Sequence, residues 1–200
     1  MKTDVIAVSG GAGRIGEALE QVDKVVAYKG LKGKNALHLR LLTEEMMGLM
    51  RSITGKKDGS FWIEDRDGVY ELHLQVRTLL TGEEKGQLLA VSSTGKNESA
   101  RGLMGRLRDF FDWGADDDIA GMSPLLLPDM YEHSSSPTLD WEWSMNRYET
   151  ALAARVEQDS PGAKEAWDEL EKSVVKNVAD DVKVSIRSGT VELVILKKLA

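Results

Sequence analysis

Apolar residues recur along the chain with two different periods, and the period predicts which kind of element each stretch forms. Between residues 15 and 28 they return every three or four positions, which is typical of a helix with one buried face; this helix is expected to run to about Tyr28 and to stop at Gly30. A second helical pattern has Asn35 as a candidate N-cap and Gly55 past its end. The apolar positions of the two helices are Ile15, Ala18, Leu19, Val22, Val25 and Val26, then Leu39, Leu42, Met46, Leu49 or Met50, and Ile53.

Strict alternation of apolar and polar residues in two other stretches predicts two β-hairpins, each with one buried face. The first hairpin turns at Asp67-Gly68, and the second turns around Ser188-Gly189. An apolar run from Val5 to Val8 and a shorter run that begins at Gln87 predict further strands. The inward positions are Tyr70, Leu72, Leu74 and Val76, which alternate with Glu71, His73, Gln75 and Arg77, and in the second hairpin Val182, Val184, Ile186, Val191, Leu193 and Ile195.

Residues from about 112 to 160 differ from the rest of the chain and are expected to form an insertion or lid within a single domain that spans residues 1–200. They include three of the chain's four prolines, a serine run and the acidic residues 116–118, which lack the spaced ligands of a calcium loop. One helix is predicted here from Trp141, Met145, Tyr148, Leu152 and Val156. Ser160-Pro161 then opens a long helix, and its buried stripe is expected at Ala163, Ala166, Trp167, Leu170, Val174 and Val178.

Composition and charge exclude several classes of function. A chain of 200 residues with 42% hydrophobic content can bury a core of its own. The formal net charge of -7 has the wrong sign for a protein that binds nucleic acid through its phosphates. The chain has no cysteine, and His38, His73 and His133 are far apart in sequence, so neither a thiolate metal site nor a histidine zinc site is expected and no residue is assigned as a metal ligand. No stretch has the apolar core of a signal peptide or the length of a membrane span, which favours a cytoplasmic protein without membrane contact.

A glycine pattern near the start of the sequence suggests a dinucleotide-binding turn. The spacing Gly11-x-Gly13-x-x-Gly16 follows an apolar run and would let a pyrophosphate approach a helix N-terminus, as in NAD(P)-dependent oxidoreductases. Such a turn belongs to a strand–helix–strand unit, and the second strand is missing here because another helical pattern follows. The alternative is a glycine-rich link between a strand and a helix.

Two other stretches carry candidate binding chemistry. In the second predicted helix, Glu45 lies about one turn before Gly48, and a carboxylate beside a gap can hold a water or a ligand. The alternative is a solvated Glu44–Glu45 pair with a glycine that allows close helix packing. The stretch STGKNESARGLMGRLRDFF predicts a loop that opens a helix, where Lys96 and Arg101 lie near free backbone amides and suit an anion.

Taken together, these segments resemble the GHKL ATP-binding fold of histidine kinases and anti-sigma-factor kinases. The resemblance is carried by LRLLTEEMMGLM, by GKNESARGLMGRLRDFF and by WDELEKSVVKNVADDVKVSIRSGTVELVILKK, and covers most of the chain apart from roughly 112–160. It implies an α/β (α+β) two-layer sandwich of the Bergerat type, with a mixed β-sheet covered by helices on one face and nucleotide held between the helices and a lid.

The resemblance also implies roles for individual residues. Glu45 matches the glutamate that acts as general base in the family's ATPases, but the metal-binding Asn four residues later is Leu49. The Asp-x-Gly-x-Gly box that recognises adenine has no counterpart in VRTLLTGEEKG. The positions that match nucleotide-binding segments are Gly48, Gly95, Lys96, Asn97, Gly102, Gly105, Gly189 and Thr190.

These departures favour a degenerate member of the family that acts as a regulatory or protein-interaction module, with nucleotide binding weak or lost. Each missing group forfeits about 1.5–3 kcal/mol, so two losses weaken affinity by about a hundredfold or more. The expected partner is another protein, and the candidate cofactors are ATP or ADP with magnesium. The first alternative is an active ATPase or serine kinase of the anti-sigma-factor type, in which Glu45 is catalytic; the second is the NAD(P)-dependent oxidoreductase.

Overall fold

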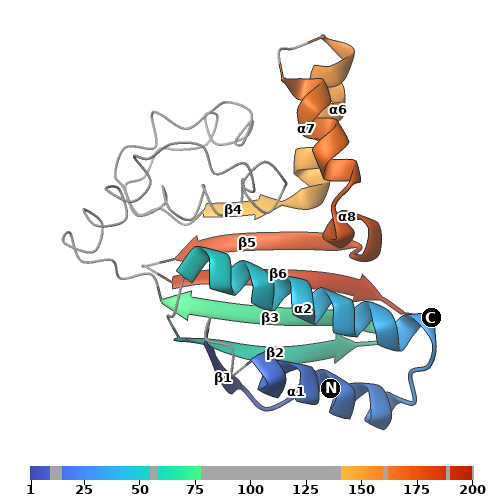
Figure 1. The fold of residues 1–200 in the computed structure, drawn as a ribbon, viewed down its shortest axis with the longest axis vertical. Helices are drawn as coiled ribbons and strands as arrows, with labels where there is room; N and C mark the ends of the chain where they lie inside the picture. The colour runs from blue at the N-terminus through green and yellow to red at the C-terminus, as the bar shows by residue number, and fades with distance from the viewer. Residues whose placement is uncertain (10–14, 55–57, 78–140, 160–161, 188–189, 200) are drawn as a thin grey trace, which may run out of the picture.

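A six-stranded β-sheet forms one layer of the fold, and two long helices cover one of its faces (Figure 1). The computed structural model describes residues 1–9, 15–54, 58–77, 141–159, 162–187 and 190–199. In their order across the sheet, the strands are β1 (Ile6–Ser9), β2 (Asp58–Arg66), β3 (Val69–Arg77), β6 (Thr190–Lys198), β5 (Asp181–Arg187) and β4 (Trp141–Ser144). The helices are α1 (Ile15–Lys29), α2 (Lys34–Thr54), α6 (Met145–Glu157), α7 (Ala163–Glu171) and α8 (Val174–Val178).

The α+β two-layer sandwich expected from the sequence is confirmed, with one correction to its sheet. All ladders between the described strands are antiparallel, so this part of the sheet is not mixed. The cause is the connectivity: β2–β3 and β5–β6 are hairpins that meet through the antiparallel ladder between β3 and β6. The short strands β1 and β4 then add to the two edges.

The hydrophobic core lies between the helices and one face of the sheet. Every second side chain of the two hairpins points into it, as the alternation predicts. The buried strand residues are Phe61, Ile63, Tyr70, Leu72, Leu74, Val76, Val182, Val184, Val191, Leu193 and Ile195. Helix α2 contributes Leu39, Leu42, Met46, Met47 and Met50 to this core, and α1 contributes Ala18, Val22 and Val25. The inward positions predicted for both hairpins are confirmed wherever the side chains are described.

Glycines and a tight turn set the boundaries of the first elements. Helix α1 ends at Lys29, and Gly30 and Gly33 have φ values of +64° and +56°, a backbone conformation that glycine adopts without strain. Helix α2 begins at Lys34, so Asn35 lies in its first turn instead of at the N-cap. The chain passes from α1 directly to α2, so the second strand of a dinucleotide-binding unit is missing there, as expected.

The C-terminal part of the described chain differs from the sequence prediction in two places. Trp141 lies in the edge strand β4, which pairs with β5, and the helix expected to include it begins only at Met145. The long helix predicted after residue 160 is two helices, α7 and α8. The side-chain oxygen of Ser173 accepts a hydrogen bond from the backbone N–H of Lys176 (3.4 Å) and so caps α8 separately.

Two glycines, one tightly surrounded in β2 and one exposed in α2, provide a matched test of packing. A Cβ atom at Gly59 would lie 2.9 Å from the carbonyl oxygen of Gln75 and 3.0 Å from Met50 Cε, whereas one at Gly48 would meet nothing within 4 Å. Gly59→Ala is therefore expected to lower the free energy of unfolding by about 1–3 kcal/mol. Gly48→Ala is expected to raise it by about 0.5–1 kcal/mol, because alanine is the better helix former. Urea unfolding of both variants measures the two changes, and equal changes would contradict the packing described.

No helix in the described ranges combines the length and the apolar character that a membrane crossing requires.

Candidate functional site

Helix α2 carries Glu45 and Gly48, two of the candidate residues predicted from the sequence. One flank of α2 faces α1, and there Arg40 donates two hydrogen bonds of 2.9 Å to the carboxylate of Asp23. Glu45 is half-buried and lies about 140° around the helix from Arg40, given 3.6 residues per turn. It therefore belongs to the flank of α2 that is turned away from α1.

Gly48 leaves space beside Glu45. A Cβ atom there would meet nothing within 4 Å in the part of the chain that the structure describes, so close helix packing does not explain the glycine there, and the solvated Glu44–Glu45 pair stays an open alternative. Leu49 follows Glu45 by four residues on the same continuous helix. The half-buried carboxylate of Glu45 thus borders an open surface.

The other candidate residues are only partly within the described structure. Thr190 is the first residue of β6, half-buried and paired with Arg77 of β3 and Arg187 of β5. Gly16 lies exposed at the start of α1. The remaining candidates lie outside the described residues: Gly11, Gly13, Gly95, Lys96, Asn97, Gly102, Gly105 and Gly189.

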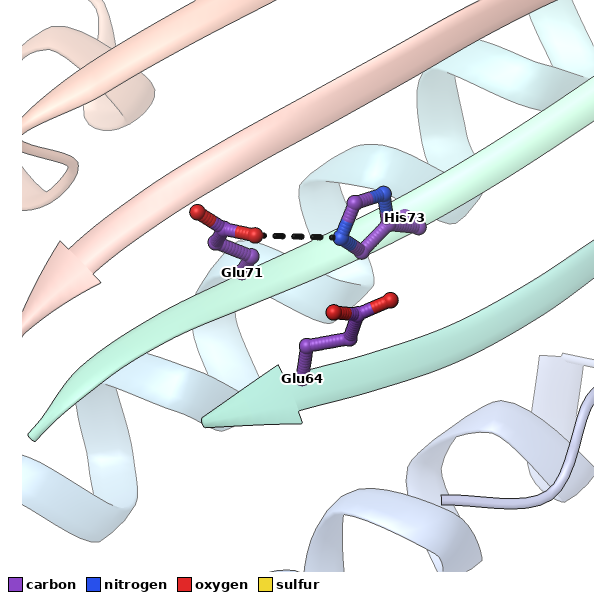
Figure 2. A group of neighbouring side chains, drawn as sticks. All are labelled: Glu64, Glu71 and His73. Carbon is purple, nitrogen blue, oxygen red and sulfur yellow. Dashed lines mark ion pairs between the residues drawn. The ribbon is translucent and has the colours of Figure 1, made fainter. Parts of the chain in front are cut away.

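A second group of polar side chains lies on the sheet face turned away from α2. The register of the β2–β3 hairpin pairs Trp62 with His73 and Glu64 with Glu71. These residues alternate with the core positions of their strands, and Glu64, Glu71 and His73 project from the same side of β2 and β3 (Figure 2). One possible ligand atom from each of these three residues lies within 4.8 Å of the other two. We call this group the imidazole–carboxylate cluster.

The ring of His73 is held on three sides. Its Nδ1 atom lies 3.2 Å from Oε1 of Glu192 on β6, and its Nε2 atom lies 3.5 Å from Oε2 of Glu71. The indole of Trp62 stacks on the imidazole with ring centroids 4.7 Å apart and planes 7° apart. His73 is only 9% exposed, although it lies on the polar side of its strand, and its buried Nε2 atom has no hydrogen-bond partner in the structure described.

Glu64 is surrounded by donors. It pairs with Lys2 (3.0 Å) and Arg66 (2.9 Å), and it accepts a hydrogen bond from the indole N–H of Trp62 (3.1 Å). The hydrogen bond from Arg66, followed by those from Lys2 and Trp62, lowers the pKa of Glu64 to about 2. Its side chain is therefore a carboxylate at any physiological pH, held by two cations and an indole N–H.

Sequence reasoning missed the cluster, although part of it was accessible. A two-residue turn at Asp67-Gly68 fixes the register, and this register alone places Glu64 opposite Glu71 on the polar face. The contact with Glu192 depends on the ladder between β3 and β6, whose strands are far apart in the sequence. The expectation of no metal site rested on the absence of cysteine and on the distance between the histidines in sequence, and one histidine with two carboxylates also makes a ligand set.

A comparison with known proteins finds no family model that matches this chain and no curated protein with a matching sequence.

Proposed function

We propose that the protein is a regulatory or protein-interaction module built on a GHKL-like scaffold, in which nucleotide binding is weak or lost. One observation carries the proposal: α2 is a continuous helix on which Leu49 lies one turn after Glu45. The residue that would hold magnesium in the family is thus replaced by an apolar residue, four positions after the residue that would activate water. The partner in this proposal is another protein in the cytoplasm.

The loss of a metal ligand favours binding of a partner over efficient hydrolysis of ATP. A triphosphate without a protein ligand for its metal loses an interaction with a charged group, which is worth about 1.5–3 kcal/mol. The open surface at Gly48 and the half-buried carboxylate of Glu45 remain, and both are accessible to a protein partner. An active ATPase or serine kinase is the second candidate, favoured by the presence of Glu45 itself.

Nucleotide binding and turnover decide between these candidates. We expect the thermal midpoint of the purified chain to be unchanged by millimolar ATP, ADP or NAD, with or without magnesium. A ligand at a hundred times its dissociation constant would add about 2.7 kcal/mol of stability and raise the midpoint. We also expect no magnesium-dependent release of phosphate from ATP.

Variants at two neighbouring glutamates make the test specific. Turnover that Glu45→Gln abolishes and that Glu44→Gln leaves intact would establish the ATPase and overturn the proposal; Glu44 is a suitable control because it is exposed and pairs with Arg40 across the turn (3.6 Å). A rise in the thermal midpoint with NAD alone, removed by Gly13→Val, would establish the oxidoreductase instead.

A further inference from the structure

We propose that His73, Glu71 and Glu64 bind one divalent transition-metal ion on the sheet face opposite α2, with Glu192 orienting the imidazole. This inference is independent of the proposed function, because the cluster and Glu45 lie on opposite sides of the sheet. Three features of the cluster support a metal ion: the buried nitrogen of His73, the geometry of the ligand atoms and the local charge.

The buried nitrogen points to a cation. When Nδ1 of His73 carries the proton and donates it to Glu192, the lone pair of Nε2 faces the carboxylate oxygen of Glu71 at 3.5 Å. Two lone pairs that face each other in a buried place repel unless a positive charge lies between them. Metal-bound histidines commonly have this arrangement, in which one ring nitrogen donates to a carboxylate and the other coordinates the ion.

The geometry is close to that of a bound metal ion. Zinc lies about 2.0–2.2 Å from nitrogen and oxygen ligands, so tetrahedral ligands are separated by about 3.3–3.6 Å. The ligand atoms of Glu64, Glu71 and His73 lie within 4.8 Å of one another, so the carboxylates need to close in by about 1 Å, which rotations of a glutamate side chain provide. Trp62 and Glu192 already fix the imidazole, and it does not need to move.

The local charge favours a divalent ion. Glu64, Glu71 and Glu192 contribute three negative charges, and Lys2 and Arg66 contribute two positive ones, so the group has a net charge of -1 when His73 is neutral. The side chains of Lys2 and Arg66 are 56% and 70% exposed, so both cations can turn to solvent when an ion takes their place. A nitrogen ligand selects a transition metal over magnesium or calcium, and three protein ligands leave a coordination position for water or a partner's group.

Calorimetric titration of the chelator-treated chain with zinc tests the site. We expect one equivalent of zinc to bind and magnesium not to compete. His73→Gln and Glu71→Gln are expected to abolish this binding, and Glu192→Gln to weaken it by about 10–100-fold, as removal of an orienting carboxylate does. His38→Gln and Glu44→Gln are matched controls outside the cluster, and both are expected to bind zinc as the original chain does.

Two results would overturn the inference. The first is no zinc binding, which would mean that His73 and Glu71 form a pair without a metal ion. The second is zinc binding that survives both His73→Gln and Glu71→Gln, which would place the ion elsewhere on the chain. The circular dichroism and urea unfolding of each variant establish that it is folded, and Glu192→Gln provides a second measure because that side chain is 33% exposed and outside the core. Nucleotide binding plays no part in these readouts, so failure here leaves the proposed function untouched.

Discussion

Phe61→Ala is expected to lower the free energy of unfolding by about 3–5 kcal/mol, the cost of a large cavity in a packed core. Phe61 is fully buried in the middle of β2, where its backbone neighbours are Ile6 on β1 and Leu74 on β3. Its side chain thus sits where three strands meet the helices. Domains are stable by only about 5–15 kcal/mol, so this single change removes a large part of the total.

Urea unfolding at a fixed temperature measures the effect as a lower midpoint with an unchanged slope. Tyr28→Ala is the control, because Tyr28 is 78% exposed on α1 and its truncation is expected to change the free energy of unfolding by no more than about 0.5 kcal/mol. A loss below about 1 kcal/mol for Phe61→Ala would show that β1, β2 and β3 do not pack under the helices as described.

The elements with strong local signals could be predicted from sequence. The hairpin of β2 and β3 follows from strict alternation together with Asp67 and Gly68, whose φ values of +53° and +83° suit a two-residue turn. The end of α1 follows from Gly30 in the same way. In both places the local conformational preference and the burial pattern agree, so little depends on distant parts of the chain.

The errors occur where distant contacts decide the structure. The apolar spacing of Trp141 and Met145 suits a helix, but pairing of residues 141–144 with β5 keeps this stretch extended. In the C-terminal helices, Val174 continues the apolar stripe of α7, yet it is 43% exposed, and Val175 is buried instead. Ser173 caps α8 as a separate helix, so the apolar stripe of α7 does not continue into α8. The spacing of apolar residues in the sequence does not reveal this break.

The candidate sites show the same division between local and distant information. Glu45 and Gly48 could be placed on one flank of a helix from spacing alone, because three residues on a helix make nearly one turn. The burial of His73 could not be predicted, because it depends on Trp62, Glu71 and Glu192 from three strands that close around the ring. His73 occupies a polar position of its strand, yet it is the more buried of the two histidines that the structure describes, His38 and His73.

The two groups of candidate residues therefore lie on opposite sides of the sheet. On the helix side, an open flank of α2 presents Glu45 next to a residue without a side chain. On the other side, the imidazole–carboxylate cluster joins β2 and β3 (Figure 2), and Glu192 of β6 contacts its histidine. The two can be tested separately, because the variants that remove one group leave the other face of the sheet unchanged.

Asp65→Asn is the second large expected effect, and it should depend on pH. Asp65 is 6% exposed at the end of β2, where its carboxylate forms an ion pair with Lys29 of α1 and accepts a hydrogen bond from the backbone N–H of Gly68 (3.1 Å). These contacts connect the last turn of α1 to the β2–β3 turn. The hydrogen bond from Lys29 is the main cause of the lowered pKa of Asp65, and burial opposes it. At neutral pH the substitution is expected to cost about 1–3 kcal/mol, because an amide cannot replace the charge.

The sign of the pH dependence follows from the lowered pKa. The contribution of Asp65 is fully present above the ordinary value of 3.8 and is lost as the pH falls below it through the lower value of the folded state. The difference in unfolding free energy between the original chain and Asp65→Asn should therefore be constant from about pH 7 to pH 5 and shrink on further acidification. Asp23→Asn, at an exposed pair with Arg40, is expected to change stability by no more than about 1 kcal/mol at any pH. A difference in unfolding free energy for Asp65→Asn that does not shrink below pH 4 would show that Asp65 stabilises the fold through its shape and not through its charge.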